Sequence, residues 1–290
     1  MTMTHGLTLV ECPRDAMQGI KTFIPTATKI EYLTTLLQQG FDVLDCGSFV
    51  NPESIPQMAD TAEVIQAISE VETKTKLLVI VANERGALRA VAYPKIKYLG
   101  FPLSVSETFQ KRNTNASREE AFRRLARIQD IAVASGKEVV AYLSMAFGNP
   151  YGDEWSAQEV AEWASKIASL GIRTISLADT IGSANGDVLG ELFEEIQHRL
   201  PHVNIGVHLH ASPTESLEKI KAAYAHGCRR FDGALGGFGG CPMAKDDLVG
   251  NIPSEIAFPW LALQENLQWV QNINWPTLTQ QAVGVYQGAE

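Results

Sequence analysis

The chain has 290 residues, of which 24 are lysine or arginine and 33 are aspartate or glutamate, so its net charge at pH 7 is −9. The length favours one large domain over residues 1–290, and the acidic balance argues against nucleic acid or anionic lipid as partners. No apolar run approaches the roughly 20 residues that cross a bilayer, and no secretory signal is visible. Four cysteines without a CxxC spacing are typical of a reducing compartment. We therefore expect a cytoplasmic α/β enzyme.

In chain order, helices are predicted by four Ser/Thr-x-x-Glu patterns, which begin at Thr28, Ser117, Ser156 and Ser212. Apolar residues at helical spacing follow each pattern, and a glycine then ends the helix. Each glycine leads within a few residues into a short strand-like segment. The complete set of predicted strands is 7–12, 41–46, 77–82, 96–101, 138–144, 172–178, 204–210 and 229–235.

Eight strands with helical patterns between them, in one domain of this size, predict a (β/α)8 TIM barrel. A doubly wound sheet is the alternative, although it would usually need fewer strands. We place the barrel at about residues 7–250. The segment 251–290 contains Trp260, Trp269 and Trp275 and is expected to form additional helices packed on the barrel.

Catalytic groups in such barrels lie at the C-terminal ends of strands and in the loops that follow. His208 and His210 are two residues apart at the end of the seventh predicted strand, so both imidazoles point to one side. A bare His-x-His pair is about as often a core or solvated pair as a metal site. Asp15, after the first strand, lies across the barrel mouth from the pair and favours a metal site, with Asn251 as a further ligand. These nitrogen and oxygen donors suit Mg²⁺ or Mn²⁺, with Co²⁺ or Zn²⁺ as substitutes.

Two further residues have both a structural and a chemical interpretation. Arg14, beside Asp15, either forms a surface ion pair or holds a developing enolate oxygen next to a metal. Cys241 lies in the loop segment GGFGGCPMAKDDLVGN, residues 236–251. It is either a small loop residue or an acid–base thiol on a lid with glycine hinges.

The ordered motifs resemble the 3-hydroxy-3-methylglutaryl-CoA (HMG-CoA) lyases of the metal-dependent aldolase and lyase barrels. The resemblance extends from the first predicted strand to beyond the eighth. It is specific because all of these motifs occur in the same order as in the family. The segments that carry it are ECPRDAMQGIK (11–21), GSFVNPESIPQMAD (47–60), YLSMAFGNPYG (142–152), ISLADTIG (175–182), VHLH (207–210) and GGFGGCPMAKDDLVGN (236–251).

The resemblance implies cleavage of HMG-CoA to acetyl-CoA and acetoacetate, a reaction of leucine degradation and ketone-body formation. It implies a divalent metal held by Asp15, His208, His210 and Asn251. Arg14 matches the residue that stabilises the enolate, Cys241 matches a catalytic cysteine, and Asp15 and His208 also enter the predicted catalytic set. The other predicted substrate-binding residues are Lys21, Tyr142, Ser176 and Asp179, which match family positions, and Ser48, which follows the second strand.

Several positions depart from the family pattern. The usual His-x-His-Asp ends in Ala211, and the usual Arg-Asp-Gly reads Arg-Asp-Ala at Ala16. A glutamate common late in the second strand is replaced by Asp45. An arginine expected in the fifth strand is absent, with Val140 and Ala141 in that region. Because of these departures, the sequence does not determine which acyl-CoA is the substrate.

The predicted mechanism is a metal-assisted retro-Claisen cleavage. The substrate's hydroxyl and carboxylate chelate the metal, Asp15 or a bound hydroxide removes the hydroxyl proton, and His208 or Cys241 returns a proton to the enolate. One alternative is a synthase of the isopropylmalate or citramalate type, which condenses acetyl-CoA with a 2-oxo acid. Another is a catalytically silent barrel. The sequence leaves open which donor acts, which metal is native, where the CoA nucleotide binds and whether the chain forms a homo-oligomer.

Overall fold

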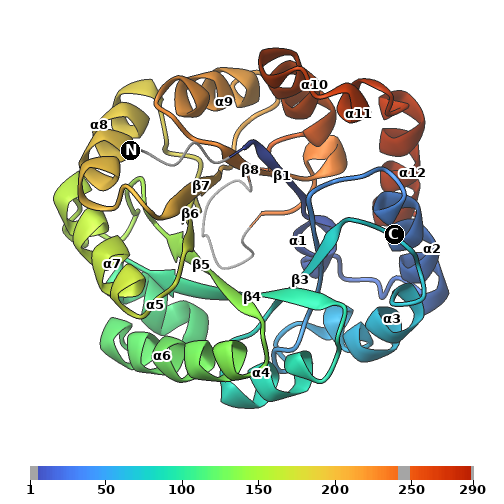
Figure 1. The fold of residues 1–290 in the computed structure, drawn as a ribbon, viewed down its shortest axis with the longest axis horizontal. Coiled ribbons are helices and arrows are strands. Elements are labelled where there is room, and N and C mark those ends of the chain that lie inside the picture. The colour runs from blue at the N-terminus through green and yellow to red at the C-terminus, as the bar shows by residue number, and fades with distance from the viewer. Residues whose placement is uncertain (1–5, 241–248, 289–290) are drawn as a thin grey trace.

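The computed structural model of the protein describes residues 6–240 and 249–288, and its strands form a closed parallel barrel (Figure 1). Each strand pairs with the next along the chain, and the last strand pairs with the first. The predicted TIM barrel is confirmed. Its strands are β1 (Thr8–Glu11), β2 (Val43–Ser48), β3 (Lys76–Ile80), β4 (Ile96–Ser104), β5 (Glu138–Ser144), β6 (Thr174–Ala178), β7 (Asn204–His208) and β8 (Arg230–Gly233).

Helices surround the barrel in a ring (Figure 1). Between the strands lie α1 (Pro13–Gln18), α2 (Thr26–Leu37), α3 (Thr61–Ile68), α4 (Glu84–Val91), α5 (Glu107–Thr114), α6 (Arg118–Ala134), α7 (Ala157–Ser169), α8 (Gly186–Arg199) and α9 (Ser216–Ala225), with a 3-10 turn η1 (Pro56–Met58). After β8 come η2 (Leu235–Gly237), α10 (Ser254–Glu265), α11 (Gln268–Gln271) and α12 (Trp275–Gln287).

The C-terminal helices complete the outer layer, as the sequence predicts for the segment after residue 250. The helix α10 follows β8, so it occupies the place of the eighth helix in the βα repeat. The last helix, α12, packs against α2, where the hydroxyls of Tyr32 and Tyr286 lie 3.1 Å apart. This contact joins the two ends of the helical ring.

The predicted helix starts are correct in the middle of the chain and displaced elsewhere. Ser117 and Glu120 form the reciprocal capping box at the start of α6, and the Ser156 hydroxyl accepts from the Glu159 amide at the start of α7. The prediction at Thr28 is wrong by three residues, because the residue that precedes α2 is Pro25, which provides no side-chain cap, and the helix begins at Thr26. The prediction at Ser212 is also displaced. Its hydroxyl donates to the Glu215 carboxylate, and α9 begins only at Ser216.

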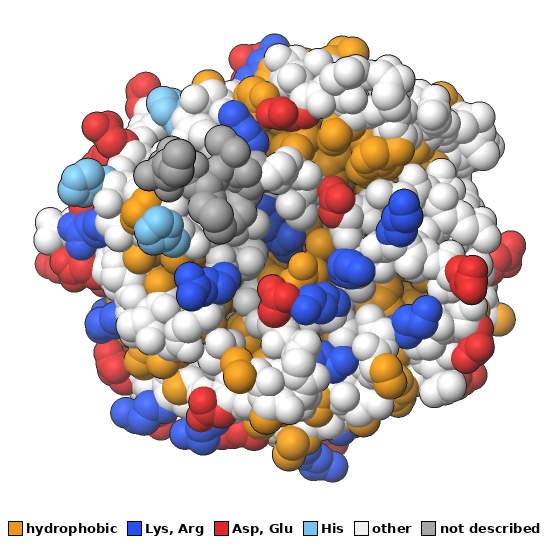
Figure 2. Space-filling view, viewed as in Figure 1, with side chains coloured by type: hydrophobic (Ala, Val, Ile, Leu, Met, Phe, Trp, Pro, Cys, Tyr) orange, Lys and Arg blue, Asp and Glu red, His pale blue; other side chains and the backbone are white. Residues whose placement is uncertain are grey.

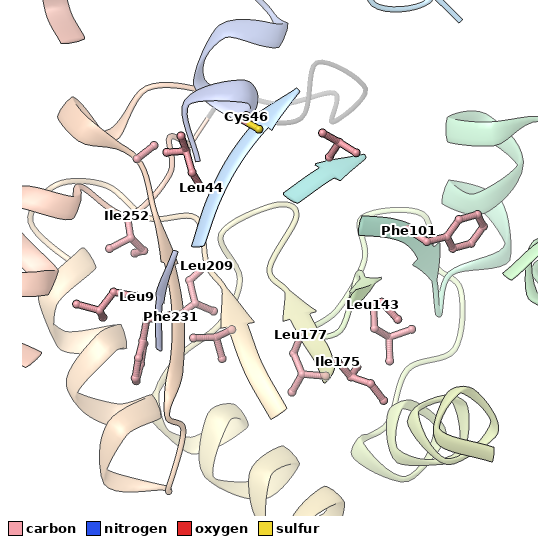
Figure 3. Close-up of a cluster of buried hydrophobic side chains, with 14 of the residues drawn as sticks. Leu9, Leu44, Cys46, Phe101, Leu143, Ile175, Leu177, Leu209, Phe231 and Ile252 are labelled. Carbon is pink, nitrogen blue, oxygen red and sulfur yellow. The ribbon is translucent and has the colours of Figure 1, made fainter. Parts of the chain in front are cut away.

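The main hydrophobic core lies between the barrel wall and the helices (Figure 3). Strand residues that point outward, such as Leu9, Leu177 and Phe231, are fully buried in this layer. Side chains alternate along a strand, so their neighbours point into the barrel. The barrel interior holds a small apolar cluster that includes Val10, Val43, Leu78 and Val140. It also holds the buried polar side chains of Asp45, Ser176, Arg230 and Asp232, and the partly exposed side chain of His208.

The surface gives two observations about partners. Among the described residues no helix combines the length and apolar character that a bilayer crossing requires. On the face shown in Figure 2, lysine and arginine side chains lie near the middle of the barrel, although the whole chain is acidic. The net charge of the chain therefore does not describe every part of its surface.

Candidate metal centre and active site

The two histidines lie together at the C-terminal end of the barrel. His208 is the last residue of β7, and its ring centroid lies 5.3 Å from that of His210. The backbone of His210 forms an antiparallel bridge with Asn251. Asp15 lies in the first turn of α1, directly after β1, and β1 pairs with β8. The fold thus gathers the four predicted metal ligands from three separate parts of the chain.

Asp15, His208 and His210 have the geometry of a metal-binding cluster. One ligand atom from each of the three lies within 4.8 Å of the other two. His210 Nδ1 lies 3.3 Å from the Thr180 carbonyl, whereas its Nε2 is buried and has no hydrogen-bond partner among the described residues. A buried ring nitrogen without a partner is costly unless a ligand binds it. The donor set of two imidazoles and a carboxylate therefore fits a divalent cation.

The carboxylate of Asp15 is held ionised by its neighbours. Burial alone would raise the pKa of Asp15, but the positive charges of Arg14 and the two histidines lower it to about 2. Its Oδ1 accepts hydrogen bonds from Arg14 Nη1 at 3.0 Å and Gln18 Nε2 at 2.7 Å. A carboxylate that is held ionised in this way suits metal ligation.

Asn251 is oriented by contacts on its amide nitrogen. Nδ2 donates to Asp15 Oδ2 at 2.7 Å and to the Phe238 carbonyl at 2.8 Å. This orientation leaves the amide oxygen for a cation. Gly239 has a positive φ of 100°, and a Cβ there would lie 2.5 Å from Asn251 Nδ2. A glycine is therefore required at residue 239 for Asn251 to take this position.

His208 has a buried partner that sequence reasoning missed. Its Nδ1 lies 3.2 Å from Oδ2 of Asp232, an inward-facing residue of β8. A proton on Nδ1 leaves Nε2 free to bind a metal, which is the usual role of a carboxylate behind a metal-binding histidine. Burial lowers the pKa of His208, but the hydrogen bond to Asp232 and the charge of Asp15 raise it overall. The one signal in the sequence is that Asp232 alternates with outward-facing Phe231 in the eighth strand.

Arg14 is buried and clamped between two carboxylates rather than lying in a surface ion pair. Its Nη2 lies 2.6 Å from Asp45 Oδ2, and its Nε lies 3.1 Å from the same oxygen. Its Nη1 donates to Asp15 and to Gln18. A guanidinium has five N–H groups. In the described part of the chain four of them are used, and one on Nη2 remains for a substrate oxygen.

The predicted substrate-binding residues fall into three kinds of position. Tyr142 and Ser176 are neighbours on β5 and β6 inside the barrel, and neither hydroxyl has a partner among the described residues. Ser48 is buried at the end of β2, where its hydroxyl donates to the Ile80 carbonyl. Lys21 is exposed in the loop after α1. Cys241 lies outside the described residues.

Asp179 is engaged by protein groups. Its carboxylate accepts from the backbone amides of Ser183 at 2.8 Å and Ala184 at 3.0 Å, and it forms an ion pair with Lys219 at 3.2 Å. Lys219 also donates to the carbonyl of His210 at 2.9 Å. The pair therefore positions the backbone at His210, and a direct contact of Asp179 with substrate stays a prediction. Lys219 is a second residue that sequence reasoning missed.

A separate cavity lies at the opposite end of the barrel. Its volume is about 260 Å³, and it is lined by residues at the starts of β3 and β4, including Lys76 and Lys97. None of the predicted site residues that the structure describes lines it. The convergent polar groups at the other end of the barrel are the better guide to the active site.

Comparisons with known proteins agree with this geometry. The family model described as HMGL-like matches residues 9–280. The mitochondrial hydroxymethylglutaryl-CoA lyase of Mus musculus is 34% identical over 255 residues, which are 88% of this chain and 78% of that protein. The cytoplasmic 3-hydroxy-3-methylglutaryl-CoA lyase of Rattus norvegicus is 35% identical over 84% of this chain and 70% of its own length.

A solved structure shows the same likeness. An HMG-CoA lyase from Acinetobacter baumannii, in complex with coenzyme A and 3-methylmalate, superposes with a TM-score of 0.84 at 30% identity. The match covers 98% of this chain and 92% of that one. The barrel, the metal-binding cluster and these relatives lead to one conclusion. The chain belongs to the HMGL-like family, and it is an enzyme of the lyase class.

Proposed function

We propose that this enzyme cleaves HMG-CoA to acetyl-CoA and acetoacetate with Mg²⁺ or Mn²⁺ bound at Asp15, His208, His210 and Asn251. The observation that carries the proposal is the cluster of Asp15, His208 and His210 directly beside a clamped arginine with a free N–H. The relatives named as HMG-CoA lyases support the substrate. Both a mitochondrial and a cytoplasmic relative exist, and we propose the cytoplasm for this chain from its sequence.

The reaction breaks one carbon–carbon bond of the acyl group. The tertiary hydroxyl loses its proton, the bond between C2 and C3 breaks, and the electron pair moves to C2. One fragment is acetoacetate, and the other is the enolate of acetyl-CoA, which takes up a proton at C2. A bound divalent cation supplies a Lewis acid that stabilises negative charge on substrate oxygen.

The protein's own groups account for the remaining needs of the reaction. The free N–H of Arg14 stabilises the enolate oxygen, and Asp45 holds the guanidinium in place for it. Asp15 would hold the cation, and either Asp15, kept ionised by Arg14, or a hydroxide at the cation would take up the proton of the tertiary hydroxyl. Cys241 is the remaining candidate for the proton donor to C2, because His208 would use Nε2 for the cation and its Nδ1 proton for Asp232. Tyr142 and Ser176 provide unpartnered hydroxyls in the barrel interior.

Product analysis tests the direction of the reaction. The purified protein is incubated with HMG-CoA in one arm, and with acetyl-CoA plus a 2-oxo acid in another, each with Mg²⁺. We expect acetyl-CoA and acetoacetate from the first arm and no consumption in the second. Condensation in the second arm without cleavage in the first would replace the lyase by a synthase.

A further inference from the structure

Four consecutive strands carry a row of inward-facing residues at one level of the barrel. Register places Tyr142 of β5 beside Ser176 of β6, and Ser176 beside Gly206 of β7. The pairing of Val207 with Phe231 places Gly206 beside Arg230 of β8. We call Tyr142, Ser176, Gly206 and Arg230 the floor row. On β7 the row is at Gly206, two residues before His208. The floor row therefore lines the barrel interior directly beneath the metal-binding cluster.

The side chain of Arg230 crosses the gap that Gly206 leaves. A Cβ at residue 206 would lie 2.8 Å from both Cγ and Cδ of Arg230, so any larger residue there would displace the arginine. The stem of Arg230 thus passes over β7 on the side that also holds Ser176 and Tyr142. Arg230 is only 2% exposed. The barrel interior therefore contains a buried guanidinium, and the absence of a side chain at Gly206 leaves the space that Arg230 occupies.

The polar atoms of the floor row are incompletely satisfied. Within the described residues, Nε and Nη2 of Arg230, the Tyr142 hydroxyl and the Ser176 hydroxyl are buried and make no hydrogen bond of good geometry, although Tyr142 lies close enough to Arg230 to raise the pKa of the guanidinium. Asp232 is the nearby counter-charge, but its Oδ1 lies 3.7 Å from Arg230 Nη2, and its Oδ2 faces His208. Unsatisfied donors of this kind are costly in a barrel interior. A guanidinium with two hydroxyls offers several donors to one bidentate acceptor.

We propose that the floor row binds the terminal carboxylate of the acyl chain, so that Arg230 selects thioesters of dicarboxylic acids over those of monocarboxylic acids. This replaces the chelation of that carboxylate by the metal, which the sequence predicts, and leaves the hydroxyl for the cation. The inference rests on the proposed function, because it assigns a substrate group to that same site. Arg230 forms the charged contact, and Ser176 and Tyr142 donate from the neighbouring strands. Burial raises the pKa of Tyr142, which therefore keeps its proton and acts as a donor.

Paired inhibitors test this assignment without turnover. Glutaryl-CoA and valeryl-CoA have acyl chains of equal length, and only the first ends in a carboxylate. Neither carries a 3-hydroxyl, so neither is cleaved, and calorimetry gives the affinity of each for the metal-loaded protein. We expect Arg230→Met to weaken glutaryl-CoA about 10- to 100-fold, the range of a lost charged hydrogen bond, and valeryl-CoA less than about 2-fold. Arg173→Met, which removes an exposed arginine before β6, is the matched control and should change neither affinity.

Two milder variants keep the test decisive if Arg230→Met does not fold. Ser176→Ala and Tyr142→Phe each remove a hydroxyl that has no partner, so stability should be retained. Each should lower the preference for glutaryl-CoA over valeryl-CoA by roughly 3- to 10-fold. An equal loss of both ligands in Arg230→Met, or an unchanged preference in both hydroxyl variants, would overturn the proposal. Failure of HMG-CoA cleavage with an intact acid preference would instead reject the proposed function alone.

Discussion

At the scale of single residues, the groups that could be predicted are those whose chemistry shows in local spacing. His208 and His210 are two apart on a strand, and Asp15 follows the first strand, so barrel topology is enough to bring them together. Asp232 and Arg230 could not be assigned in this way, because their contacts with His208 and Gly206 depend on the register between the neighbouring strands β7 and β8. The sequence also shows Val140 where an arginine was expected in the fifth strand. The structure places the buried interior arginine on β8.

Asp232 is expected to control metal affinity without touching the metal. Asp232→Asn keeps the size of the side chain but weakens its hydrogen bond to His208 Nδ1, so the ring is less well oriented. We expect Mn²⁺ affinity to fall about 10- to 100-fold, the usual effect of losing the partner of a metal-binding histidine. Titration of the metal-free protein with Mn²⁺ measures this directly. Equal affinities of the variant and the parent would show that Asp232 does not orient the ligand.

Cys241 and His210 are expected to separate proton transfer from metal binding. Thiolate is a poor ligand for a hard cation, so Cys241→Ala should leave Mn²⁺ affinity nearly unchanged and lower kcat by about 10²- to 10⁴-fold. His210→Ala should weaken Mn²⁺ binding first and recover part of its activity at high Mn²⁺. Parallel titrations and kcat measurements distinguish the two effects. A wild-type kcat in Cys241→Ala would show that this thiol is not the proton donor.

At the scale of elements, the segments and their order could be predicted, while their ends depended on contacts that propensity does not contain. The strand predicted at 138–144 matches β5, because strong β-formers lie between clear breaks there. The start of α2 differs from the Ser/Thr-x-x-Glu pattern at Thr28, because the helix follows Pro25 directly and begins without a side-chain cap. A further contact between elements joins residues that are far apart in the sequence, so no local pattern predicts it. Glu11 of β1 is fully buried and accepts from the Leu235 amide of η2 and the Ser254 hydroxyl of α10.

This contact of Glu11 predicts a pH dependence of stability. Burial, as the largest cause, raises the pKa of Glu11 to about 8. The unfolded chain releases this proton near pH 4.5, so the group lowers the free energy of unfolding as pH rises from about 4.5 to 8. We expect Glu11→Gln to raise Tm by several degrees at pH 8 and by little at pH 5. Melting curves across this range measure it, with exposed Glu194→Gln as control. A Tm difference that is constant with pH would refute the assignment.

At the scale of the whole molecule, the barrel could be predicted because one structural unit repeats eight times. The repeat of strand, loop and helix leaves few architectures for a chain of this length, and closure places all strand ends at one mouth. What the repeat could not predict is the interior of the barrel. Its polar lining depends on side-chain alternation and on the small residue Gly206. The repeat therefore predicts that the candidate ligands Asp15, His208 and His210 lie together. Of the residues beneath them, Tyr142 and Ser176 are expected only from the family resemblance, and Arg230 and Gly206 are not expected at all.

The most direct test of the account is the dependence of HMG-CoA cleavage on one bound divalent cation. The protein is stripped with EDTA, freed of chelator and titrated with Mn²⁺, while bound metal and acetyl-CoA formation are followed in the same samples. We predict no cleavage by the stripped protein, and a rise in activity that parallels binding of one cation per chain. Affinity should fall below about pH 6, as the imidazoles take up protons. Full turnover of HMG-CoA in the stripped protein would contradict the account.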